Sequence, residues 1–136
     1  MMTSKVVYTG GLRCESTHTR SQQVIHTDAP PDNHGRGEAF SPTDLLSTSL
    51  ANCMLTIMGI AAGENEKLLK GAFAEVTKVM ASGPRRVSEI HLKVYLPAQY
   101  PESDRLRLEQ AGLNCPVAKS LHPDIVQDIE FYWTLE

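Results

Sequence analysis

The stretch 42–62, PTDLLSTSLANCMLTIMGIAA, limits the fold more than any other part of the chain. Ser41 precedes Pro42, and Asp44 follows Ser41 by three residues, which is the spacing of an N-terminal capping box. Gly63 is a typical C-terminal stop for a helix. The pattern therefore predicts one long helix over 42–62.

Apolar side chains cover more than one side of this predicted helix. Spacings of three and four residues align one apolar stripe, formed by Leu46, Leu50, Cys53, Ile57 and Ile60. Four further apolar side chains lie outside that stripe, namely Leu45, Met54, Leu55 and Met58. A surface helix of a small monomer does not need so much cover, so we expect an extensive partner interface and interpret it as a homodimer.

Alternating segments precede and follow the helix. The predicted strands are 4–10, 12–17, 22–28, 71–82, 86–97 and 124–136. The segment 29–40, rich in Pro, Gly and Asn, is predicted as a loop. Two more helices are predicted over 101–114 and 115–121. The order βββ-α-ββ-αα-β indicates an α+β fold with antiparallel sheets, in a single domain over 1–136.

Two of these elements have a predicted buried face. In the strand 86–97, the apolar face consists of Ser88, Ile90, Leu92 and Val94. In the helix 101–114, the inner side is marked by Leu106, Leu108 and Leu113.

Composition narrows the class of protein. The net charge is −3 and no basic run occurs, which argues against nucleic acid and anionic membranes as partners. The N-terminus lacks a signal-peptide core, and the apolar run 50–62 is interrupted by polar residues and short for a bilayer span. We therefore expect a cytoplasmic protein with reduced thiols and, with only three cysteines, no disulfide framework.

Metal and hydrolase chemistry have little support in the residues. The five histidines show no paired ligand spacing, and neither CxxC nor HExxH occurs, so we predict no metal and no cofactor. A Cys-His hydrolase needs a base beside Cys53, and no residue is predicted there. Cys14, beside Arg13 on a predicted strand, is interpreted as a structural thiol.

Cys53 and Cys115 are the candidate reactive groups. Cys53 lies in the long helix, where a small core side chain is the simplest interpretation, since burial raises the pKa of a thiol. Cys115 precedes Pro116 and a new helix, an N-cap position that favours thiolate. If the helices cross, the two thiols meet, and a reactive thiolate beside a resolving thiol is the arrangement of a thiol peroxidase.

Two motifs carry a family resemblance. GRGEAFSPTDLLSTSLANCMLTIMGIAAGE and the later NCPVAKSLHP resemble the OsmC/Ohr family of osmotically inducible and organic-hydroperoxide-resistance proteins. The resemblance implies an intertwined homodimer with two symmetric interface sites, in which sheets from both chains wrap two central helices. It implies that Cys53 is the peroxidatic cysteine and Cys115 the resolving one. It also implies organic hydroperoxides as substrates, matching the apolar surroundings, and a lipoyl or other small dithiol as reductant.

The resemblance also implies an arginine that stabilises the thiolate. We expect Arg13 in this role, with Arg20 and Arg36 as further candidates. The family holds its arginine with a glutamate in the first turn of the cysteine helix, and the matching position here is Thr43. Two nearby acids are candidates to replace that glutamate, namely Glu38 and Asp44.

The sequence therefore predicts a cysteine-based peroxidase that reduces organic hydroperoxides. Because Thr43 replaces the family glutamate, a second hypothesis is kept. In that hypothesis the same dimer binds an apolar small molecule or senses redox state without catalysis.

Overall fold

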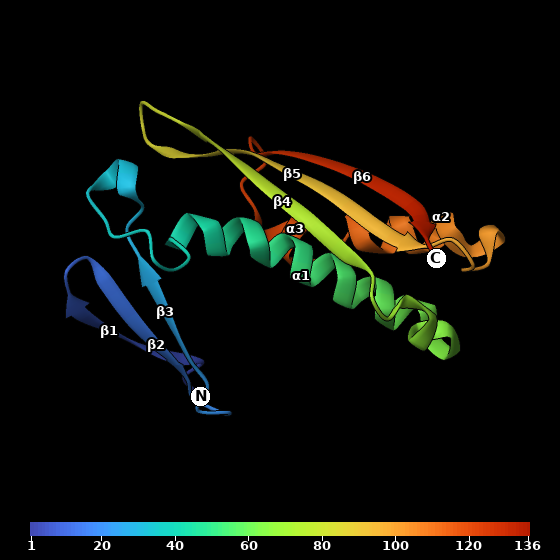
Figure 1. The fold of residues 1–136 in the computed structure, drawn as a ribbon, viewed down its shortest axis with the longest axis horizontal. Coiled ribbons are helices and arrows are strands. Elements are labelled where there is room, and N and C mark those ends of the chain that lie inside the picture. Colours follow the sequence, from blue (N-terminus) through green and yellow to red (C-terminus); the bar gives the residue numbers. More distant parts are fainter. The chain divides into compact units, whose positions relative to one another are not determined.

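The computed structural model describes all residues, Met1–Glu136, which form two compact units, Met1–Leu46 and Ser47–Glu136. The first unit holds an antiparallel sheet in the order β1-β2-β3, with strands Ser4–Gly10, Arg13–His18 and Val24–Asp28 (Figure 1). Gly10 and Gly11 take positive φ angles in the tight connection between β1 and β2, as the predicted hairpin requires. A short 3₁₀ turn, η1 (Pro31–Asn33), interrupts the predicted loop.

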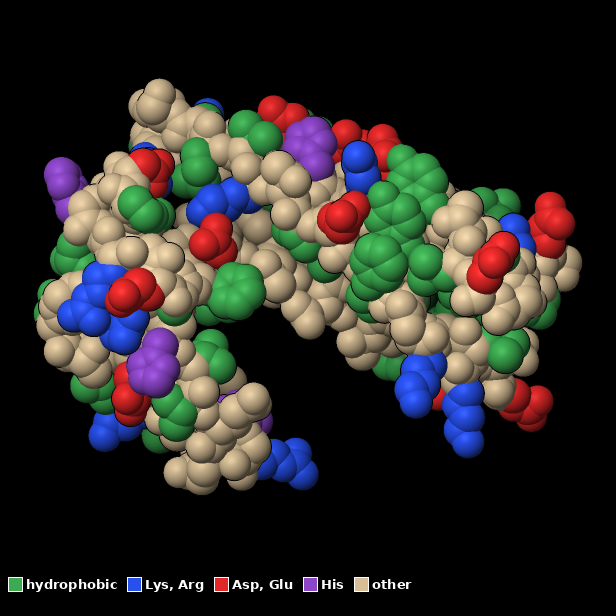
Figure 2. All heavy atoms as spheres, viewed as in Figure 1, with side chains coloured by type: hydrophobic (Ala, Val, Ile, Leu, Met, Phe, Trp, Pro, Cys, Tyr) green, Lys and Arg blue, Asp and Glu red, His purple; other side chains and the backbone are tan.

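The β1–β3 sheet has no apolar core within its own unit. Val6, Val7 and Tyr8 of β1 are all exposed, although they point alternately to the two faces of the sheet. Hydrophobic side chains at the surface, interleaved with charged ones, are visible in Figure 2. The most buried side chains of this unit are instead polar: Thr27, Asp28 and Ser41.

Helix α1 spans Pro42–Ala62, the range predicted from the sequence. The capping box is reciprocal: the Ser41 N–H donates to Asp44 Oδ2 at 2.9 Å, and the Asp44 N–H donates to Ser41 Oγ at 3.0 Å. Gly63 has a positive φ of 58°, and the chain continues as the 3₁₀ helix η2, Gly63–Leu69, which was not predicted. Local end chemistry thus fixes both ends of α1.

The most buried line of α1 differs from the predicted stripe. It consists of Ser47, Leu50, Ala51, Met54, Met58 and Ala62. Of the predicted stripe, Leu50 is fully buried, Cys53 is half-buried and Ile60 is 70% exposed. Because α1 is apolar on more than one side, periodicity alone cannot identify the side that packs on its own chain.

The second unit contains a mixed sheet in the order β4-β5-β6, with strands Phe73–Ala81, Arg86–Pro97 and Val126–Leu135. β4 pairs with β5 in the predicted antiparallel sense, but β6 pairs with β5 in parallel. The connection from β5 to β6 explains the difference. It contains helices α2 (Glu102–Leu113) and α3 (Pro116–Ser120) and can return the chain to the starting end of the sheet.

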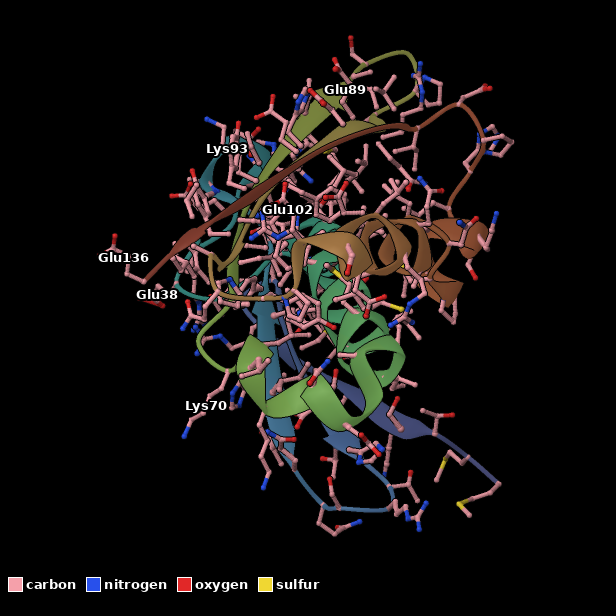
Figure 3. The ribbon with its side chains drawn as sticks, turned by 90° about the vertical axis from the view of Figure 1, so that its right-hand side faces the viewer. Glu38, Lys70, Glu89, Lys93, Glu102 and Glu136 are labelled. Atoms are coloured by element: carbon pink, nitrogen blue, oxygen red, sulfur yellow. The ribbon has the colours of Figure 1, made fainter.

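The apolar core lies between this sheet and the helices, on the side away from Glu89 and Lys93 in Figure 3. On the predicted face of β5, Ile90, Leu92 and Val94 are buried and Ser88 is half-buried. Val87 is buried as well, because the register shifts between Val79 and Met80. The largest buried core side chains are Leu50, Met54, Met58, Ile90, Leu92, Leu96, Tyr100 and Leu108.

Helix α2 faces the core differently from the prediction. Leu108 is fully buried as expected, but Leu106 is 67% exposed and Leu113 also lies at the surface. The buried positions of α2 are Leu108 and Gly112, four residues apart and so on one helix face. Leu106 and Leu113 lie away from that face.

The structure confirms the α+β class and the predicted order of strands and helices. The single-domain organisation over 1–136 stays a prediction. Pro42–Leu69 has the length and apolar composition of a bilayer span, although the apolar run 50–62 alone is short for one. Its buried side chains, among them Leu50, Met54 and Met58, pack into the core of the second unit.

Candidate functional site

Cys53 lies in α1 at the edge of the core. Its neighbour Met54 is fully buried, whereas Cys53 is only partly buried. Thr56 and Ile60 follow Cys53 by three and seven residues and share its helix face, and Ile60 is largely exposed. The Cys53 thiol therefore lies between packed core and exposed apolar surface, where a solute can reach it.

Cys115 occupies the N-cap of α3, as the sequence predicted. Its side chain is fully buried, and its Sγ accepts a hydrogen bond from the Ala118 N–H at 3.5 Å. Its own N–H donates to the Gly112 carbonyl at 3.1 Å, which ties it to the last turn of α2. The end of α2 and the start of α3 therefore fix the position of this thiol.

The two thiols are close enough to interact directly. Burial is the main reason that the pKa of Cys115 is raised; the Ala118 N–H opposes this, and the neighbouring Cys53 raises it further. The N–H groups at the start of α3 do lower the pKa of Cys115, as the N-cap position predicted, but burial outweighs them and the net direction is upward. The structure brings Cys53 and Cys115 together within one unit. Their roles in redox chemistry stay predictions.

Arg13 is the first residue of β2 and is held mainly by Asp28. Its Nε donates to Asp28 Oδ1 at 2.7 Å and its Nη2 to Asp28 Oδ2 at 2.8 Å, a bidentate pair. The Nη2 also donates to Glu38 Oε1 at 3.3 Å. Arg13 is thus oriented by two carboxylates, and Asp28 makes the shorter contacts.

The Asp28 carboxylate is completely buried, and both of its oxygens accept hydrogen bonds. It also accepts the Glu38 backbone N–H at 3.1 Å. Hydrogen bonds from Arg13 hold the pKa of Asp28 below its usual range against the cost of burial, with help from the Glu38 N–H and the Arg36 charge. The Asp28 bond likewise raises the pKa of Arg13, so the pair stays charged.

The other residues considered in the sequence analysis do not gather at one site. Glu38 contacts Arg13, but its side chain is 65% exposed, so it fixes the guanidinium less firmly than Asp28 does. Asp44 serves in the capping box with Ser41. Arg20 lies in an exposed turn, and Cys14 pairs across the sheet with Thr27. The role of Arg13 as activator of a thiolate stays a prediction.

Asp28 is the residue that the sequence reasoning missed. In the β2–β3 ladder, Arg13 lies directly opposite Asp28, and Cys14 opposite Thr27. Opposite charges at facing positions of adjacent strands attract each other. The signal was therefore present in the hairpin register, whereas Glu38 and Asp44, the predicted partners of Arg13, lie near the start of the helix.

An open pocket of about 440 Å³ lies along α1 and η2 in the second unit. Its lining residues are Leu55, Thr56, Gly59, Ile60, Glu66, Leu69 and Lys70. Thr56 and Ile60 share the helix face of Cys53, so this face of α1 leads from the thiol to the pocket.

Comparison with known proteins identifies the family. The model of the OsmC-like protein family matches residues 35–130. A protein from Psychrobacter arcticus, named for osmotic stress and detoxification, is 53% identical, with a TM-score of 0.92 over 97% of this chain and 96% of that one. Among curated proteins, none matches the chain.

More distant structures share the fold. An organic hydroperoxide resistance protein, OsmC, from Legionella pneumophila is 14% identical, with a TM-score of 0.74 over 97% of this chain and 98% of that one. One from Vibrio cholerae, solved with captopril in one of its active sites, is 16% identical, with a TM-score of 0.72 over 96% and 92%. The chain therefore belongs to the OsmC/Ohr family of OsmC-like proteins, a membership that supports a redox or stress-related role.

Proposed function

We propose that the chain is a cytoplasmic, homodimeric cysteine peroxidase that reduces organic hydroperoxides at the expense of a small dithiol. Cys53 attacks, Cys115 resolves, and Arg13, held by Asp28 and Glu38, stabilises the attacking thiolate. The observation that carries the proposal is the direct interaction of a half-buried thiol, Cys53, with a fully buried one, Cys115.

The proposed reaction has three balanced steps. The Cys53 thiolate attacks the outer oxygen of the hydroperoxide; the O–O bond breaks, Cys53 becomes a sulfenic acid, and the alkoxide takes a proton to leave as an alcohol. The Cys115 thiol then attacks the Cys53 sulfur, which forms a disulfide and releases water. A dithiol reduces that disulfide by exchange and leaves as its own cyclic disulfide.

The different environments of the two thiols support different roles. Cys53 is partly exposed, and a hydroperoxide must reach its sulfur. Cys115 is buried and its raised pKa keeps it protonated at neutral pH, so it does not compete for peroxide. It becomes useful only once the neighbouring Cys53 sulfur has been oxidised.

The charged cluster supports the role of Arg13. A bidentate bond to a buried carboxylate fixes a guanidinium far better than an exposed partner does. Asp28 thus supplies the carboxylate that the family places in the cysteine helix, where this chain has Thr43. In the proposed dimer, this cluster approaches Cys53 and lowers the free energy of its thiolate.

Exposed apolar surface supports both the dimer and the substrate class. The β1–β3 sheet exposes valines and a tyrosine that a second chain would cover. The pocket on the same side of α1 is lined in part by Leu55, Ile60 and Leu69, which suit an alkyl chain better than hydrogen peroxide. An alkyl or fatty-acid hydroperoxide is therefore the proposed substrate.

The test is consumption of cumene hydroperoxide and tert-butyl hydroperoxide with dihydrolipoamide as reductant. Cys53→Ser should abolish turnover, because no other thiol replaces the attacking sulfur. Cys115→Ser should permit one turnover and leave a sulfenic acid that dimedone traps. Cys14→Ser is the matched control and should keep wild-type activity. Wild-type turnover no faster than that of Cys53→Ser would contradict the proposal.

A second candidate function is a dimeric binding or redox-sensing protein for an apolar small molecule, favoured by Thr43 in place of the family glutamate. Alkylation of Cys53 as a function of pH separates the two. An apparent thiol pKa above about 8.5, the unperturbed value, together with a small molecule that co-purifies, would favour binding over catalysis.

A further inference from the structure

Gly112 is a buried glycine in the last turn of α2, and its backbone does not need to be glycine. Its φ angle is not among the positive ones of this chain. Glycine inside a helix is destabilising relative to alanine, because it loses more backbone freedom on folding. A conformational reason for this glycine is therefore absent, and a steric one is needed.

The steric reason is the close approach of α2 to α1. A Cβ atom at position 112 would lie 2.8 Å from the Met54 Cγ, and 3.1 and 3.2 Å from the Met58 Cγ and Sδ. The first distance is shorter than any van der Waals contact, so one helix or both methionines would have to move. The missing side chain of Gly112 lets the helices meet here.

This contact lies beside both thiols. Met54 is the residue after Cys53, and the Gly112 carbonyl accepts the hydrogen bond from the Cys115 N–H. Gly112 therefore touches the helix that carries one thiol and is bonded to the backbone of the other. A shift of α2 away from α1 must carry Cys115 away from Cys53.

We propose that Gly112 is a positioning residue that sets the approach of Cys115 to Cys53 and so controls formation of the disulfide between them. Its effect on peroxide turnover rests on the proposed function, but the approach of the thiols does not. Disulfide geometry is narrow, with Cα atoms usually about 4.4–6.8 Å apart, so a small displacement matters. The proposed step joins the Cys53 sulfenic acid and the Cys115 thiol to a disulfide and water.

The first test needs no peroxide. Wild type and Gly112→Ala, both in a Cys14→Ser background, are equilibrated in glutathione redox buffers, and the Cys53–Cys115 disulfide is quantified by alkylation and mass spectrometry. Glutathione disulfide takes up the electrons of the two thiols. We expect the equilibrium constant for the protein disulfide to fall by about tenfold or more in Gly112→Ala.

Gly59→Ala is the matched control, because it adds the same methyl group to a helical glycine. A Cβ there would meet only the Glu66 Cγ, at 3.9 Å. The control should keep the constant within about twofold of wild type. A folded Gly112→Ala protein whose constant equals that of the control would overturn the proposal.

A second variant covers the case in which Gly112→Ala does not fold. Met54→Ala removes the Cγ atom that the new methyl group would strike first. Adding Gly112→Ala to Met54→Ala should then lower the constant far less than adding it to wild type. An equal fall in both backgrounds would show that the contact with Met54 is not the cause.

Single-turnover kinetics separate positioning from mere loss of structure. With a stoichiometric organic hydroperoxide, Gly112→Ala should form the Cys53 sulfenic acid at the wild-type rate and convert it to the disulfide about tenfold more slowly. Equal slowing of both steps would contradict a positioning role. If wild type consumes no hydroperoxide, the proposed function fails, and the glutathione equilibrium still decides the role of Gly112.

Discussion

The two units of this chain are stabilised by different interactions. Ser47–Glu136 has a core in which Leu50, Met54, Leu92 and Leu108 are fully buried. Met1–Leu46 buries hardly any apolar side chain, and its most buried group is the carboxylate of Asp28, which is bonded to Arg13. Hydrophobic burial scales with the apolar area removed from water, so the first unit gains little from it.

The groups proposed to carry out the chemistry are also divided between the two units. The unit with the apolar core carries the two thiols, and the unit without one carries the fixed cation. A thiol gains reactivity from a nearby cation, whereas a cation retains its charge and orientation best with a carboxylate partner. We therefore expect the stability of the two units to respond differently to three changes. These are truncation of core side chains, a fall in pH and association with a second chain.

Truncation in the core of the second unit should have the largest effect. Leu92 is about 1% exposed, so Leu92→Ala removes buried apolar surface and leaves a cavity. We expect the free energy of unfolding to fall by about 2–5 kcal/mol, measured by urea denaturation. The matched control is Leu106→Ala in α2, which should change stability by no more than about 0.5 kcal/mol. Equal losses in both variants would contradict the observed core.

Removal of the buried carboxylate should have the next largest effect. Asp28 has a lowered pKa, so its contribution to stability is fully present above its unfolded pKa of about 3.9 and is lost as pH falls through the folded value. Asp28→Asn should therefore be less stable than wild type at pH 7, and the difference should shrink by pH 3. Urea midpoints at both pH values measure this, since guanidinium salts would screen the pair.

Asp124→Asn is the control for that experiment, because the Asp124 side chain is 89% exposed. It should match wild type at pH 7. If Asp28→Asn were as stable as Asp124→Asn at neutral pH, the Arg13–Asp28 pair would contribute nothing to the first unit. In that case the distinction between the units would rest on burial alone.

Loss of the N-terminal cap of α1, which lies in the first unit, should have a smaller effect. Ser41→Ala removes the oxygen that accepts the Asp44 N–H, and we expect a loss of about 1 kcal/mol, measured by urea denaturation. Ser103→Ala, at an exposed position of α2, is the control and should be close to neutral. An equal, negligible loss at both positions would show that α1 does not depend on this cap.

The parts of the fold that sequence could predict depend on local chemistry. The ends of α1 follow from Ser41, Asp44 and Gly63, and the buried residues Ile90, Leu92 and Val94 of β5 follow from alternation. The approach of Cys115 to Cys53 was a hypothesis, because it depends on how separate helices pack. Its N-cap position was predictable, but the direction of its pKa depends on burial, which no motif reports.

The parts that could not be predicted depend on choices between similar alternatives. Both the core line and the exposed line of α1 are apolar, so Met54 and Met58 could not be ranked above Ile60. The parallel pairing of β6 depends on the path of α2 and α3. Asp28 could have been identified as the partner of Arg13 from the register of β2 and β3. The position of the turn fixes which residues face each other across a hairpin, and opposite charges at facing positions attract.

The smallest effect within one chain is expected for Val7→Ala, and it is the sharpest test of what covers the first unit. Val7 is 45% exposed in β1, so truncation should cost no more than about 0.5 kcal/mol at a protein concentration where the chain is monomeric. If a second copy covers this sheet, as proposed, the loss should grow with protein concentration, because association then contributes to stability. Val94→Ala, in the core of the second unit, should lose more at every concentration, because its contacts lie within the chain. Thermal denaturation across a hundredfold dilution series separates these outcomes, and a constant, negligible loss for Val7→Ala would mean that no second chain covers this face.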